Sequence, residues 1–235
     1  MSIKTVQYKD YYYSTRKSDY ELYFSFDIKY DVTDFTMSGK NCRSLDISLK
    51  IEYLFLIDNK GKLHKDGKSF NEWLLTCQLD NNCSFDSSIM INSQYRSYGV
   101  GTLAINKILL LAQKYIPNHK LQGKLSPVDA GKDNFERRYK LYKNLGFHVT
   151  ENSFYVEKLS TLKIEHNING IEKIDAVKTL YDLFENKQQL QFEVSFLKND
   201  KQRIFTHLDK LEKSLLVYKK LMLLSVLTIL YILLS

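Results

Sequence analysis

The chain has 235 residues, 44% of them hydrophobic, which suits one domain of ordinary size with an appended segment, or two small domains. Its formal net charge is +7, but the basic residues are spread along the chain, which argues against a nucleic-acid-binding surface. The three cysteines, Cys42, Cys77 and Cys83, lack zinc-type spacing and are odd in number, so we expect buried free thiols in a reducing compartment.

The hydrophobic pattern predicts strands and helices from residue 42 to residue 159. The first 40 residues are polar and tyrosine-rich, so we expect no signal peptide and assign no element to them. Alternating apolar residues predict strands, and apolar residues at helical spacing predict helices. Their order predicts an α+β fold with one central mixed sheet flanked by helices. The predicted strands are 42–57, 70–79, 87–92 and a weak one at 120–128, the predicted helices are 102–116 and 133–147, and a strand pair covers 147–159.

A heptad pattern follows residue 170. Apolar residues from Leu180 to Met222 keep one 3–4 spacing, with Lys187 and Lys201 at two of its a positions, and neither proline nor glycine occurs after residue 170. This pattern predicts a long helix whose coiled-coil seam makes a homodimer through residues 170–222. Several short helices packed on the main domain are the alternative, because part of the segment also alternates like a strand.

The last residues, 221–235, carry no charge and follow Lys219 and Lys220. A helix of this length spans about 22 Å, against a hydrocarbon core of roughly 30 Å. We expect a C-terminal membrane anchor at 219–235, with the rest of the chain on the cytoplasmic face. A cytoplasmic soluble protein, with the tail buried in an oligomer core, is the alternative. The predicted organisation is therefore a catalytic domain at 1–159, a helical stalk at 160–218 and the anchor.

A glycine-rich turn, SQYRSYGVGT at 93–102, joins a predicted strand to a predicted helix. The first N–H groups of a helix have no intrahelical acceptor, and the helix dipole is positive there, so such a turn can bind an anion. Gly99 and Gly101 would let a phosphate approach, and Arg96 would add charge. The turn lacks the Lys-Ser/Thr of a P-loop and the third glycine of a dinucleotide fingerprint.

A second motif, NFERRYKLYKNLGF at 134–147, follows in the order and spacing of a known family. Together with the Arg96-x-x-Gly-x-Gly turn, it resembles the GNAT superfamily of acetyl-CoA-dependent N-acetyltransferases over roughly residues 40–158. The resemblance implies that the turn binds the acetyl-CoA pyrophosphate and that Tyr142 is the catalytic acid. It implies cofactor-binding roles for Ile89, Ile91, Arg96, Ser97, Tyr98, Gly99, Val100, Gly101, Thr102 and Asn134.

The implied reaction transfers acetyl from acetyl-CoA to an amine by direct attack, with no metal. A phenol can protonate the leaving thiolate, although a tyrosine at position 142 could equally be a core residue. No general base is evident: Glu52 and Asp86 are candidates on the pattern alone. The acceptor amine stays unidentified, and the dispersed charge gives little support to an RNA-linked one. The alternative function is a degenerate GNAT-fold binding or scaffold module without acetyl transfer.

Overall fold

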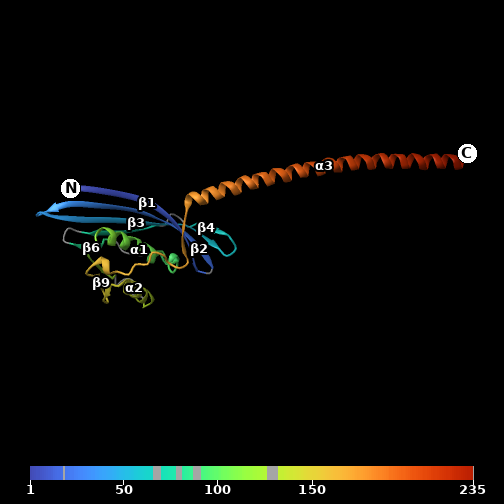
Figure 1. The fold of residues 1–235 in the computed structure, drawn as a ribbon. Coiled ribbons are helices and arrows are strands. Elements are labelled where there is room, and N and C mark those ends of the chain that lie inside the picture. The colour runs from blue at the N-terminus through green and yellow to red at the C-terminus, as the bar shows by residue number, and fades with distance from the viewer. Residues whose placement is uncertain (18, 66–69, 78–80, 87–90, 126–131, 235) are drawn as a thin grey trace. The chain divides into compact units, whose positions relative to one another are not determined.

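The computed structural model describes residues 1–17, 19–65, 70–77, 81–86, 91–125 and 132–234, without the side chains of residues 132–134 and 228–234. The chain divides into two compact units, Met1–Asp175 and Ala176–Ser235. The first unit holds a ten-stranded sheet, and the second is one long helix (Figure 1). The structure confirms the predicted α+β class, with one mixed sheet and a long C-terminal helix.

The sheet is antiparallel except at one pair among the described strands. Its order is β10-β1-β2-β3-β5-β6-β7-β9-β8, with β4 paired to β3, and β6 and β7 run parallel. The helix α1 connects these two parallel strands in the sequence, as a parallel pair requires a crossover. The strands are β1 (Ser2–Lys17), β2 (Tyr20–Met37), β3 (Lys40–Asp58), β4 (Leu63–His64), β5 (Phe70–Cys77), β6 (Asn82–Phe85), β7 (Lys120–Lys124), β8 (His148–Val149), β9 (Ser153–Val156) and β10 (Ile171–Ile174).

The helical elements are fewer. They are α1 (Val100–Tyr115), α2 (Lys132–Leu145), α3 (Ala176–Leu234) and the short 3-10 turns η1 (Ser93–Tyr95) and η3 (Leu159–Thr161). The predicted helices at 102–116 and 133–147 correspond to α1 and α2. Gly146, with a φ of +97°, ends α2, a position where a residue without Cβ is favoured.

Two long strands, β1 and β2, occupy the N-terminal region to which the sequence pattern assigned no element. In β2, Phe24, Phe26 and Ile28 alternate with polar residues and are fully buried, because successive side chains of a strand point to opposite faces. A two-residue turn of Ser38 and Gly39, both with positive φ, then leads into β3. The sheet is therefore wider at its N-terminal side than predicted.

The core lies between α1 and one face of the sheet. The helix α1 packs its apolar face on β3 and its neighbours, burying Ile105, Ile108 and Leu109 completely. On the opposite sheet face, Lys9 and Lys50 form salt bridges with Glu52. The sheet thus has a buried face that carries α1 and a charged face, which is the usual division in antiparallel sheets.

The strand that precedes the glycine turn differs from the prediction. Residues 87–90 of the predicted strand 87–92 lie outside the described residues, and Ile91 and Asn92 are not in a strand. The described strand before the turn is β6, which was not predicted. The weak strand at 120–128 is shorter in the structure, as β7 ends at Lys124.

The expectation of three free thiols is also corrected. Cys77 and Cys83 are direct neighbours across β5 and β6, both almost fully buried, and they form a disulfide. The pairing register, which the spacing of the cysteines in the sequence does not reveal, brings them together. Cys42 is the free cysteine of the described residues.

The helix α3 extends without interruption over 59 residues. Among the residues that the structure describes, no helix combines the length and the apolar character needed to cross a membrane. This finding contradicts the predicted transmembrane anchor at 219–235. The charge-free run at 221–235 is shorter than the roughly 20 apolar residues that a spanning helix needs, and it continues a helix whose preceding turn carries Lys219 and Lys220.

Candidate anion-binding site

The glycine turn is held in place by aromatic and hydrogen-bonding contacts. The ring of Tyr95 stacks on that of Tyr53 in β3, with centroids 3.7 Å apart. Tyr98 is buried, and its carbonyl oxygen accepts a hydrogen bond of 2.8 Å from Ser14 Oγ in β1. Burial, with Tyr20 and Asp19 nearby, raises the pKa of Tyr98, so its phenol stays neutral. These contacts fix the turn against the sheet at the point where α1 begins.

The backbone of the turn is bent through unusual conformations. Ser97 has a φ of +72° although it is not glycine, and Gly99, the residue before α1, has a φ of +80°. The carbonyl oxygen of Gly99 accepts the first hydrogen bond of the helix, from the N–H of Leu103 at 3.0 Å. The N–H groups of Val100, Gly101 and Thr102 lie in the first turn of α1, where no intrahelical acceptor exists.

The two glycines make room for side chains of this chain. A Cβ at Gly99 would lie 2.7 Å from Arg16 Nη1 and 2.9 Å from Ile171 Cδ1. A Cβ at Gly101 would lie 3.3 Å from Ile91 Cγ1. The space that the sequence pattern reserves for a phosphate is thus occupied on these two sides by protein atoms. An anion at this turn would meet the helix N–H groups and the neighbouring cations instead of the glycine Cα atoms.

Three cations gather at the positive end of α1. The guanidinium of Arg16 packs against Gly99, and the Nε of Arg96 donates a 3.0 Å hydrogen bond to the Ile91 carbonyl oxygen. The Nζ of Lys17 lies 4.5 Å from the centre of the Tyr98 ring. Within the described part of the chain, no salt bridge joins these three side chains to a carboxylate. Together with the helix dipole, these three positive charges favour an anion here, although the Asp19 carboxylate also lies near Tyr98.

Arg16 is the residue that the sequence pattern missed. It lies more than 80 positions before Gly99, and its side chain passes Gly170, the residue before β10, whose Cβ would lie 2.8 Å from Arg16 Cγ. The pairing of β10 with β1 places both segments beside the turn. A local motif search could not find this contact, because it depends on strand pairing across most of the unit.

Tyr142, which lies on α2, belongs to a cluster of aromatic side chains. Its ring stacks on Phe154 at 4.0 Å and contacts the edge of Phe147, and only 4% of the residue is exposed. Burial raises the pKa of Tyr142 well above its ordinary value, so the hydroxyl keeps its proton at neutral pH. No hydrogen bond or ring contact among the described residues joins Tyr142 to the glycine turn.

The other predicted cofactor-binding positions are only partly described. Ile89 lies outside the described residues, and so does the side chain of Asn134, whose backbone lies in the first turn of α2. Of the candidate bases, Glu52 lies on the charged sheet face, where the hydrogen bond from Lys9 lowers its pKa. Asp86 accepts hydrogen bonds from the hydroxyls of Thr76 and Ser84.

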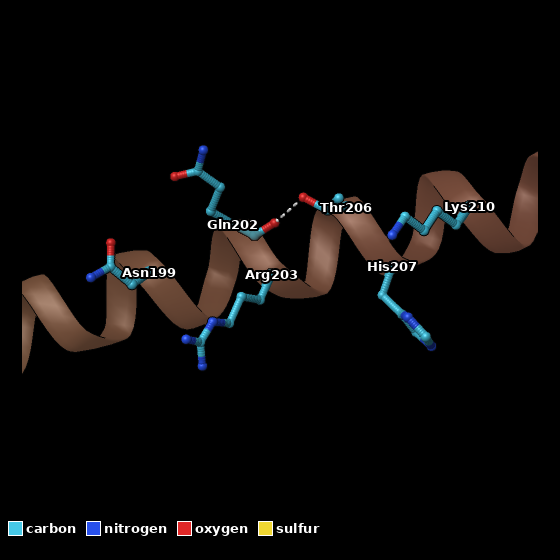
Figure 2. A pocket seen from close by; sticks show the side chains of 6 residues that line it. All are labelled: Asn199, Gln202, Arg203, Thr206, His207 and Lys210. Carbon is cyan, nitrogen blue, oxygen red and sulfur yellow. Dashed lines mark hydrogen bonds between the residues drawn. The ribbon is translucent and has the colours of Figure 1, made fainter.

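A shallow hollow also occurs on α3, and Figure 2 shows the side chains around it. Every lining residue comes from this one helix, so the hollow has no second wall that could enclose a ligand. It is lined by Asn199, Gln202, Arg203, Thr206, His207 and Lys210. We call these six residues the polar face of α3. Among the described residues no group of side chains could hold a metal ion.

Comparison with known proteins adds no relative. No protein-family model, no curated protein and no solved structure matches the chain.

Proposed function

We propose that the Met1–Asp175 unit is an acyl-CoA N-acyltransferase that transfers an acetyl group from acetyl-CoA to an amine. The observation that carries the proposal is the set of three cations at the start of α1, Arg16, Lys17 and Arg96, which form no salt bridge with a carboxylate of the described residues. A pyrophosphate offers two negative groups to these cations and to the free N–H groups of the helix. The Arg-x-x-Gly-x-Gly pattern and the later Tyr142 motif supply the resemblance that names the cosubstrate.

The position of the turn in the sheet supports the same proposal. The parallel strands β6 and β7 have their carboxyl ends at one edge of the sheet, and each strand is followed by a helix, α1 or α2. Ligands of sheets with parallel strands commonly bind beyond these carboxyl ends, beside helix N-termini. A cosubstrate bound at α1 would therefore lie on the side of the sheet from which α2 also begins.

In this proposal the protein orients the amine and the thioester and transfers protons between them. The neutral amine attacks the thioester carbon, and N–H groups stabilise the oxyanion that forms. The carbon–sulfur bond then breaks, and Tyr142 gives its proton to the thiolate. The nitrogen loses one proton, which returns to the Tyr142 phenolate and restores the acid, so the neutral reactants release no net proton. The raised pKa of Tyr142 keeps the proton in place but makes the phenol a weaker donor.

The burial of Tyr142 also favours a second candidate function. The ring contacts of Tyr142 with Phe147 and Phe154 are those of a core residue, so this tyrosine can stabilise the fold without taking part in a reaction. With no general base identified, a unit that binds CoA or another phosphorylated ligand without acetyl transfer is the alternative. The two functions differ in a measurable way, because only the enzyme produces free thiol in the presence of an amine.

The test is the thermal stability of the full chain with acetyl-CoA. Ligand at 100 times its Kd should stabilise the protein by about 2.7 kcal/mol, and inorganic pyrophosphate should compete. Arg16→Gln should weaken this effect about tenfold or more in Kd. The control is Lys60→Gln, which removes an exposed charge in the turn between β3 and β4. Equal stabilisation of both variants would exclude the turn as the binding site, and binding without thiol release would favour the alternative.

A further inference from the structure

The helix α3 carries a long apolar seam, interrupted by Lys187 and Lys201, that its own unit leaves exposed. Leu190 and Leu197 are 60% and 65% exposed, and Ile204 is 60% exposed. The seam residues share one heptad frame, and none of them is less than half exposed. They are Leu180, Leu183, Leu190, Val194, Leu197, Ile204, Leu208, Leu211, Leu215, Tyr218 and Met222. A row of this length is typical of a helix that packs against another helix.

The opposite side of the same helix is polar. The polar face of α3 falls at b, c, f and g positions of the heptad frame, whereas the seam occupies a and d. Figure 2 shows these side chains projecting from one stretch of α3. The middle of α3 is therefore amphipathic, although Phe192 and Phe196 are apolar residues outside the seam.

We propose that this seam is the interface of a parallel, in-register dimer formed with a second copy of the chain. A second copy offers a seam of equal length and identical spacing, which can be matched heptad by heptad. The proposal concerns α3 alone, and it holds whether or not the first unit transfers acetyl groups.

The charges beside the seam are complementary in this arrangement. In a parallel dimer, a residue at g lies next to the e residue five positions further along the partner helix. Glu193 at g then meets Lys198 of the second copy, and His207 at g meets Glu212. By symmetry each pair forms twice. An antiparallel dimer places g beside g and separates Glu193 from Lys198.

The register is also favoured by charge. A shift of one heptad would separate both Glu193–Lys198 pairs; it would set one Asp200 beside Glu212, two carboxylates together, and the other Asp200 beside Lys198. In register, Asp200 lies next to the a-position Lys201 of the other helix. The two a-position lysines, Lys187 and Lys201, weaken the seam, but their charged ends can leave the narrow core of a dimer. Higher oligomers would bury them more deeply.

The first test is the mass of the full chain in solution. Sedimentation equilibrium at low micromolar concentration should give twice the chain mass of 27.7 kDa. Leu197→Asp should raise the dissociation constant at least 100-fold. The matched control, Thr206→Asp on the polar face of α3, adds the same charge to the same helix and should leave the mass unchanged. Circular dichroism verifies that each variant is folded.

A second test determines the relative orientation of the two helices. Glu193→Lys should weaken the dimer about tenfold or more, and adding Lys198→Glu should restore it. In a Cys42→Ser background, Leu211→Cys should form a disulfide between copies under mild oxidation. Lys210→Cys, one position away on the outer side, should not.

A monomer at tens of micromolar would overturn the proposal, because the seam would then pack within its own chain or remain exposed. A trimer or tetramer would overturn the two-stranded arrangement. Failure of the double charge reversal to restore the dimer, together with no cross-link at position 211, would overturn the parallel orientation.

Discussion

The close packing of Arg16 on Gly99 can be tested by comparing how much two glycine-to-alanine substitutions lower the free energy of unfolding. Gly99 and Gly39 have nearly the same φ, +80° and +75°, both in the left-handed region. An L-residue in the left-handed region costs roughly 1–2 kcal/mol, and this cost is common to both positions. They differ in their surroundings: a Cβ at Gly39 would have nothing within 4 Å, whereas one at Gly99 would meet Arg16 and Ile171.

We therefore expect Gly99→Ala to destabilise the protein more than Gly39→Ala does. Gly39→Ala should lower the free energy of unfolding by about 1–2 kcal/mol. Gly99→Ala should lower it by about 1–2 kcal/mol more, because Arg16 and Ile171 must move to admit a methyl group. For a protein of this size each kcal/mol lowers Tm by about 2–4 °C. Urea unfolding of the full chain, followed by circular dichroism, measures the difference directly.

The arginine can be tested in the same assay. If the extra cost at Gly99 comes from Arg16, then Gly99→Ala should cost less in an Arg16→Ala background, with Ile171 supplying what remains. Equal losses at Gly39 and Gly99 in the parent protein would refute the close packing of Arg16 on the turn. They would also remove Arg16 from the candidate anion-binding site.

Two further predictions concern Tyr142 and Asp10. Tyr142→Phe should keep the affinity for acetyl-CoA and lower turnover by about 10²–10⁴-fold, measured as thiol release, and unchanged turnover would remove Tyr142 from the mechanism. Asp10 is buried, which alone would raise its pKa, but the hydrogen bonds from Lys173 and Tyr12 and the charge of Lys107 hold its pKa below the usual value. A depressed pKa stabilises the fold above the unfolded pKa near 4 and ceases to do so as pH falls through the folded value. Asp10→Asn should therefore cost about 1–3 kcal/mol at pH 7, and the gap should narrow below about pH 4 in pH-dependent unfolding.

The sequence predicted those elements whose burial pattern is local. The helix α1 was recognised because Ile105, Ile108 and Leu109 repeat at helical spacing, and β3 because its apolar residues alternate. In contrast, β1 was overlooked because polar residues occupy inward positions: Asp10 and Ser14 are both buried. Short β6, with four residues, offers too few positions for a period to be detected.

The candidate site was predictable only in part, for a related reason. The glycine turn and its place before a helix follow from ten consecutive residues. The cation that packs on Gly99 comes from β1 and lies against Gly170, just before β10, and strand pairing over such a separation leaves no trace in a local pattern. The predicted membrane anchor was wrong because its apolar run, the end of α3, is shorter than a membrane-spanning helix.

The pairing of β1 with β10 has a consequence for biosynthesis. Tyr11 pairs with Ile174, so the ribosome must add more than 150 residues after β1 before β10 can cover the part of its outer edge from Tyr11 to Ser14. At translation rates of about 5–20 residues per second, this takes on the order of 10–30 s. During that interval β1 presents unpaired N–H and C=O groups, to which other nascent chains or chaperones can bind. Because Ile171 contacts the turn at Gly99, the candidate anion-binding site is also completed only when this last strand has been translated.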